Sequence, residues 1–173
     1  MFNGNLALGG RLAAWFLLSL SLGATAVPRP VLAGSKATTL GVSLTINAAC
    51  TVSAAPIIFS AQSVLGGAVG QTGAVVVTCT NISPYNIQFD QGAGASATVT
   101  NRQMTGPASA TVSYALYRDA AHTLNWGKTN GTDTLAGTGN GTAQTLTVYG
   151  LVTAQSTPAP GAYADTVNVT VSF

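Results

Sequence analysis

Charged side chains are scarce in this sequence of 173 residues, and glutamate is absent. Only 6% of the residues are Asp, Glu, Lys or Arg. So few and so scattered charges argue against a basic surface for nucleic acid and against a polybasic segment for anionic lipid. The four acids also form no neighbouring pair of the kind that acid–base hydrolysis of sugars requires; they are Asp90, Asp119, Asp133 and Asp165.

Long apolar runs are missing as well, and the most apolar stretch has the pattern of a secretory signal. Arg11 precedes the run Leu12–Leu22, which is too short to span a bilayer and is followed by small residues. Cleavage fits after Ala26 or after Ala33, and we expect the second because it leaves a polar start. An uncleaved anchor is the alternative. Removal of residues 1–33 takes two of the six basic residues, which leaves a neutral mature chain without a membrane span.

Cysteine and histidine are nearly absent. The chain has two cysteines, Cys50 and Cys79, and one histidine, His122. An even cysteine count in an exported chain predicts a disulfide. It would close a loop of about 29 residues and stabilise the fold by about 3.5 kcal/mol. A metal or redox pair is the alternative, but the spacing is not that of a CxxC motif.

What the sequence does contain is alternation of apolar with polar residues, without a helical period. Glycine, proline and Asn-Gly pairs separate the alternating runs. Short strands at close intervals predict a single antiparallel β-sandwich domain. The alternating runs lie at 40–46, 75–79, 85–89, 112–117, 146–150 and 167–173; a short apolar run lies at 57–59, and 129–142 is expected to be a loop or hairpin end.

Both ends of the expected mature chain are alternating runs. A strand that ends on Phe173 cannot turn back to supply its own next partner, so the sheet edge beside it stays open. Burial of the four apolar side chains in residues 40–46 would contribute about 6–12 kcal/mol. Three residues, about 10 Å of extended chain, separate this run from Cys50. The pattern leaves two readings open: the first strand of its own domain, or a strand added to another chain.

Several short segments, in this order and spacing, carry a family resemblance. They are 47–52 (NAACTV), 75–80 (VVVTCT), 84–87 (PYNI), 102–104 (RQM), 114–119 (YALYRD), 126–127 (WG), 148–150 (VYG) and 161–173 (GAYADTVNVTVSF). Together they resemble the spore coat protein U domain, the fold of archaic, Csu-type chaperone–usher pilins. The resemblance covers most of the mature chain.

The resemblance implies an all-β fold: an incomplete immunoglobulin-like antiparallel β-sandwich that lacks its last strand and carries an N-terminal donor strand. Residues 1–33 would be the signal peptide, 34–49 the donor extension and 50–173 the sandwich. Within the donor segment, residues 38–47, the inserted side chains would be Leu40, Val42, Leu44 and Ile46. The acceptor groove, which also contacts the chaperone, would be lined by Val167, Val169, Val171 and Phe173. Cys50 and Cys79 would form the disulfide.

The implied function is that of a non-enzymatic structural subunit of a surface fimbrium that serves adhesion and biofilm formation. Its partners would be a periplasmic chaperone, an outer-membrane usher and neighbouring subunits, and no cofactor or metal is implied. A spore-coat-type structural protein is the alternative assembly.

Two further alternative functions rest on small groups of residues. A monomeric carbohydrate-binding sandwich would use Trp126, Tyr117 and Tyr149 as a sugar platform. A hydrolase would use His122, with Asp119 close in sequence; we favour a solvated hairpin residue instead. Asp90 and Asp133 lie outside any calcium-loop pattern, and whether Arg102 pairs with Asp165 or caps loop backbone is left open.

Overall fold

The computed structural model describes Pro30 and residues 33–173. The predicted signal peptide, residues 1–33, lies outside the described residues except for Pro30 and Ala33. Residues 33–49 carry no helix and no strand. No helix in the described part of the chain is long and apolar enough to cross a membrane.

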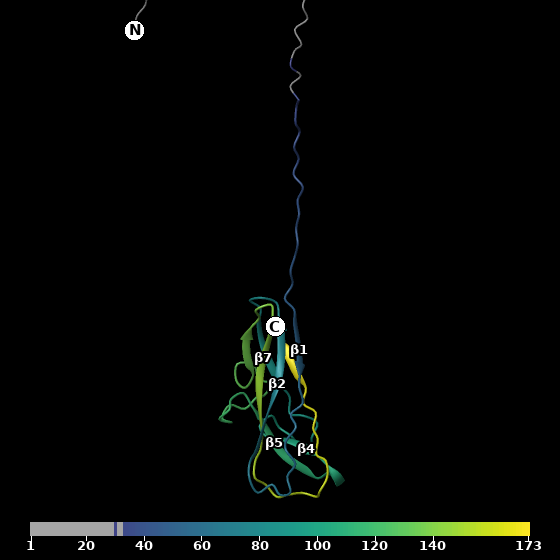
Figure 1. Cartoon of the computed structure of the whole chain (residues 1–173), viewed down its shortest axis with the longest axis vertical. Coiled ribbons are helices and arrows are strands. Elements are labelled where there is room, and N and C mark those ends of the chain that lie inside the picture. Colours follow the sequence, from purple (N-terminus) through teal and green to yellow (C-terminus); the bar gives the residue numbers. More distant parts are fainter. Residues whose placement is uncertain (1–29, 31–32) are drawn as a thin grey trace, which may run out of the picture. The chain divides into compact units, whose positions relative to one another are not determined.

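The described residues form two antiparallel sheets, which confirms the predicted fold class (Figure 1). The larger sheet has the order β1-β2-β7-β5-β4, and the smaller has the order β6-β3-β8. Every pairing between strands is antiparallel. The strands are β1 Cys50–Ala54, β2 Val69–Cys79, β3 Pro84–Phe89, β4 Arg102–Thr105, β5 Thr111–Tyr117, β6 Leu135–Thr138, β7 Ala143–Val152 and β8 Val169–Ser172, with a 3₁₀ turn at Pro107–Ser109.

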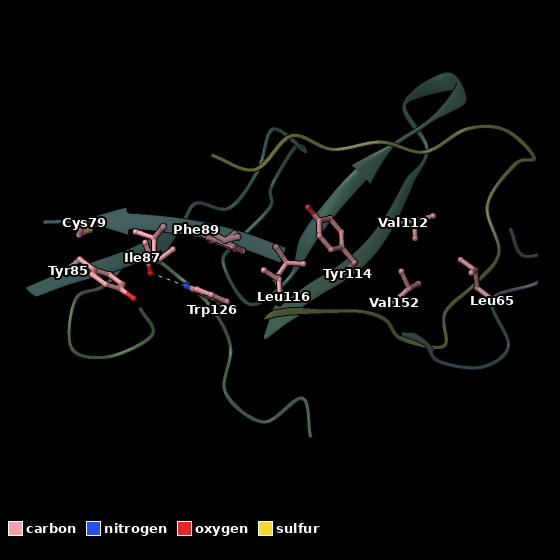
Figure 2. Close-up of a cluster of buried hydrophobic side chains, with 13 residues drawn as sticks. Leu65, Cys79, Tyr85, Ile87, Phe89, Val112, Tyr114, Leu116, Trp126 and Val152 are labelled. Atoms are coloured by element: carbon pink, nitrogen blue, oxygen red, sulfur yellow. Dashed lines mark hydrogen bonds between the residues drawn. The ribbon is translucent and has the colours of Figure 1, made fainter. Parts of the chain in front are cut away.

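The core lies between the two sheets, because alternation turns every second side chain inward. In β3 the inward residues Tyr85, Ile87 and Phe89 are buried while their neighbours are more exposed. Trp126 is fully buried beside them; its indole Nε1 donates a hydrogen bond to the Ile87 carbonyl over 2.9 Å (Figure 2). Its ring stacks on Phe89 with centroids 4.4 Å apart. The tryptophan thus satisfies its donor while filling the core.

The predicted disulfide is present. Cys50 in β1 lies opposite Cys79 in β2, and the two are bridged with their Cα atoms 4.1 Å apart. The bridge fixes the start of the first strand to the end of the second.

Several segments differ from the expectation drawn from the sequence, and strands β1 and β4 lie outside every predicted alternating run. Residues 129–142 contain a strand, β6, that pairs with β3. A Cβ atom at Gly137 would lie 2.4 Å from the Tyr85 ring, so the small residue lets the two strands approach. Residues 57–59 lie outside any strand, and the last strand begins at Val169 rather than Val167.

Strand β8 is at the edge of its sheet and pairs with β3 alone among the described strands. Across the sandwich it lies close to β1, the edge strand of the other sheet; Figure 1 shows the C-terminal strand in yellow beside β1. The sandwich therefore has two neighbouring edges whose outer backbone groups have no strand partner in the described chain.

Candidate functional site

An open apolar groove begins where β1 ends and β8 begins. It has a volume of about 900 Å³ and lies between residues 54–65 on one side and 157–169 on the other. Neither flank is a regular strand over most of its length. The floor consists of inward residues of both sheets and the flanks add further apolar side chains; among them are Ile57, Phe59, Leu65, Val69, Val75, Met104, Val112, Leu116, Val148, Val152, Val167 and Val169.

The four residues predicted to line the groove occupy different places. Val167 and Val169 line it. Val171 is partly buried against the core farther along β8, and Phe173 is 60% exposed. The sequence did not point to the opposite flank, Ile57 and Phe59; the short apolar run at 57–59 was the only available signal.

A hydrogen-bonded pair, Tyr114 and Asp165, is among the polar residues that line the groove. The Tyr114 hydroxyl donates a 2.7 Å hydrogen bond to Asp165 Oδ2. The other carboxylate oxygen accepts from the backbone N–H groups of Ala93 and Thr166, both over 2.8 Å. Burial, followed by the hydrogen bond to Asp165, raises the pKa of the Tyr114 hydroxyl. Asp165 thereby fixes the segment before β8 to the floor of the groove.

Asp90 fixes the same segment from the other side. Its Oδ1 accepts hydrogen bonds from the backbone N–H groups of Gly92 and Asn168, and its Oδ2 accepts from the Asn168 side chain. Partial burial opposes ionisation of Asp90, but the hydrogen bonds from Asn168 and Gly92 outweigh it, so its pKa is lowered. Asp90 is thus a structural carboxylate, and the described residues hold no cluster of three potential metal ligands.

Arg102 caps loop backbone and makes no ion pair with Asp165. The side chain is fully buried, and its guanidinium donates to the carbonyls of Trp126 and Val99 over 2.7 Å and of Asp90 over 2.9 Å. Burial lowers the pKa of Arg102, and nearby acids oppose that effect. One cation therefore holds three loops together beneath the groove.

Residues 33–49 contain the predicted donor segment. Leu44 and Ile46 are 86% and 76% exposed, so they do not pack in the core of their own domain. Leu40 and Val42 are equally exposed. The first strand of the described chain is β1, and residues 40–46 form no strand.

The aromatic residues considered for a sugar platform are separated. Trp126 lies in the core, whereas Tyr117 and Tyr149 lie opposite each other on β5 and β7. His122 packs edge-on against both tyrosines, with ring centroids 5.2 and 6.4 Å away. The Asp119 carboxylate accepts hydrogen bonds from the backbone of Thr123 and Leu124, so it serves the hairpin turn and does not orient a catalytic histidine.

Comparisons with known proteins identify the family of the chain. A family model described as Spore Coat Protein U domain matches residues 36–170. "Protein U" of Myxococcus xanthus is 38% identical over 117 residues, which cover 65% of this chain and 65% of that protein. The chain thus spans about two thirds of that relative's length.

A solved structure shares the fold. It is the CsuC–CsuE chaperone–tip adhesion subunit pre-assembly complex from the archaic chaperone–usher Csu pili of Acinetobacter baumannii. The TM-score is 0.56 at 20% identity, and the match covers 75% of this chain and 41% of the other.

Proposed function

The chain belongs to the Spore Coat Protein U domain family, and on that basis we propose that it is a structural subunit of a surface fibre assembled by donor-strand exchange. In this proposal residues 38–47 of one subunit insert beside β8 of the next. The role is structural rather than enzymatic. The observation that carries the proposal is the combination, in one chain, of an open apolar groove at a free strand edge with an exposed alternating segment.

The two parts match in chemistry. The groove offers an apolar floor, and it leads to the outer edge of β8, whose backbone groups have no partner among the described strands and can pair with a new strand. The segment offers Leu40, Val42, Leu44 and Ile46 on one face, and their burial would contribute about 6–12 kcal/mol. Since a whole domain is stable by about 5–15 kcal/mol, insertion would decide the stability of the subunit.

The groove also explains the partners we propose. A subunit with an exposed apolar groove would aggregate unless another chain covers it. A periplasmic chaperone would cover the groove. At an outer-membrane usher, the next subunit's donor segment would replace the chaperone. The product would be a fimbrium at the cell surface that serves adhesion and biofilm formation. The signal peptide, residues 1–33, would direct export, residues 34–49 would be the donor extension, and 50–173 the acceptor domain.

A coat is the second candidate for the assembled state, because the matching family is described by a spore coat protein. Head-to-tail strand insertion generates an open polymer in either case. Electron microscopy of cells that express the gene with its neighbouring genes distinguishes the two: isolated fibres indicate a fimbrium, and a continuous layer indicates a coat.

The test of donor-strand exchange changes the donor segment in the full chain, co-expressed with its chaperone and usher. Deletion of residues 34–46, or Leu44→Lys, should abolish fibres because the groove receives no apolar strand or must receive a charge. Thr45→Lys adds the same charge one residue away, on the opposite face of the strand, and should leave fibres intact. Fibres of normal yield from the deletion would overturn the proposal.

A further inference from the structure

Ile82 is the most anomalous exposed residue of the sandwich. It has φ of 58° and is 81% exposed. The other non-glycine residues with positive φ are small or polar, or a histidine, whereas a β-branched side chain is crowded in this conformation. An isoleucine here gains nothing from packing in its own subunit. Such an outlier suggests a function outside the fold of the single chain.

The turn that carries Ile82 is rigid. Ile82 N donates to the Gly139 carbonyl over 2.8 Å, and Gly139 N donates back to Ser83 over 2.7 Å. The same turn holds the root of the donor segment: Thr80 N donates to the Ala49 carbonyl over 2.9 Å, and Ala49 N donates to the Thr80 hydroxyl over 3.0 Å. Ile82 is therefore displayed next to the point where the donor segment leaves the sandwich.

We propose that Ile82 of one subunit docks against a second copy of this chain. The contact lies at the rim of the groove into which the first subunit's donor segment inserts. We define the groove rim as Ile58 together with residues 158–160 (Pro-Ala-Pro). The inference rests on the proposed donor-strand exchange. It adds a second contact between subunits, separate from the inserted strand, which holds the two sandwiches in one orientation.

The tether between strand and sandwich brings the two surfaces together. All strand pairs of the fold are antiparallel, so a donor antiparallel to β8 has its Ile46 end beside the start of β8, where the groove is open. Only residues 47–49 then separate Ile46 from Cys50, a reach of about 10 Å. The donor subunit's Ile82 turn consequently lies at the mouth of the acceptor's groove.

The two surfaces are also chemically alike. Ile58 is 73% exposed and lines the groove, as do Pro158 and Pro160. Neither residues 80–83 nor residues 56–64 and 157–161 include a charged side chain. A neutral apolar contact of this kind buries exposed hydrophobic surface on both partners.

The decisive variant is Ile82→Asn, because asparagine tolerates positive φ and removes the apolar contact. The subunit in its chaperone complex should be at least as thermally stable as wild type, since backbone crowding is relieved. Its fibres should still form but bend more easily, because a contact between neighbouring sandwiches is lost. Electron microscopy should show a fall of about two-fold or more in the persistence length of the fibres. Ile58→Asn should do the same, and the double variant should add little.

Leu124→Asn is the matched control, because Leu124 is also an exposed apolar residue, 51% exposed, in a different turn. Unchanged persistence length in Ile82→Asn fibres, or an equal fall in Leu124→Asn fibres, would overturn the proposal. The donor-strand proposal fails separately, on the deletion of residues 34–46.

If Ile82→Asn yields no fibres, cross-linking decides. Fibres of a chain carrying Ile82→Cys and Ile58→Cys are treated with a short bismaleimide and run on a denaturing gel. A ladder of linked subunits supports the contact, and monomers alone overturn it.

Discussion

The two ends of the sandwich differ in how they are completed. At the disulfide end, β1 pairs with β2, β3 pairs with both β6 and β8, and Val77 and Ile87 have no exposed surface. At the other end, residues 55–65 and 157–168 are irregular, and an apolar groove of about 900 Å³ stays open between them. At the disulfide end the core is thus covered by the chain's own residues, although β1 and β8 remain sheet edges, whereas the other end has an apolar floor without a covering strand.

This difference shows that a core can be tightly packed in one part while another part of the same core has no strand to cover it. The buried cluster of Trp126, Phe89 and Ile87 is packed and hydrogen-bonded as in any stable domain. A few residues away, the same core opens into the groove.

Measurements of the two ends need a folded subunit with its groove filled. A chain with residues 38–47 appended after Phe173 through a flexible linker provides one; we call it the donor-complemented subunit.

The largest effect is expected at Arg102, whose buried guanidinium holds three loops together. Arg102→Met should lower the free energy of unfolding by about 3–5 kcal/mol, because it leaves buried carbonyls without their cationic donor. Chemical denaturation of the donor-complemented subunit measures it. Lys128→Met removes an exposed cation and should change stability by less than about 0.5 kcal/mol. A cost for Arg102→Met no larger than that of the control would contradict the capping role.

Loss of the disulfide should be the next largest effect. The double variant Cys50→Ala with Cys79→Ala should lose about 3.5 kcal/mol, since the unfolded chain regains the entropy of a loop of about 29 residues. Reduction of the unsubstituted protein should produce the same loss. A change below about 1 kcal/mol in both experiments would show that this end of the sandwich does not depend on the bridge.

A pair of matched valines tests the comparison most directly. Val77→Ala at the closed end should cost about 2 kcal/mol whether or not the groove is filled. Val69→Ala, at a partly buried valine that lines the groove, should cost that much only when the donor is inserted. The state with an empty groove is produced by Leu44→Lys in the appended donor copy. Equal costs for Val69→Ala in both backgrounds would mean that the donor does not cover this part of the groove.

The smallest effect concerns pH. The lowered pKa of Asp90 means that its stabilising contribution is complete above the unfolded-state pKa of about 3.9 and is lost as the pH falls through the lower, folded-state pKa. Because Asp90 is largely solvent-screened, the contribution should stay below about 1 kcal/mol. Asp90→Asn should flatten the acid limb of the stability profile. An acid limb identical to that of the unsubstituted chain would assign the pH dependence to other carboxylates.

Most of the fold could be predicted from the sequence because period-two alternation reports directly on a half-buried strand. The runs around Val77, Ile87 and Leu116 became strands β2, β3 and β5. Strand β6 was missed because its partner-facing residue is Gly137, which carries no apolar signal and is needed for the close approach of Tyr85. The late start of β8 was missed because Val167 continues the alternation but lines the groove instead of pairing.

The sequence by itself predicted a β-domain with one disulfide and with alternating apolar residues at both ends of the expected mature chain, because composition and periodicity depend only on local order along the chain. Only the tertiary structure decided that Leu44 and Ile46 are exposed, that Arg102 caps carbonyls, and that the groove lies between residues 54–65 and 157–169. These facts depend on which segments far apart in sequence come to lie side by side, and alternation along a single strand carries no record of its neighbours.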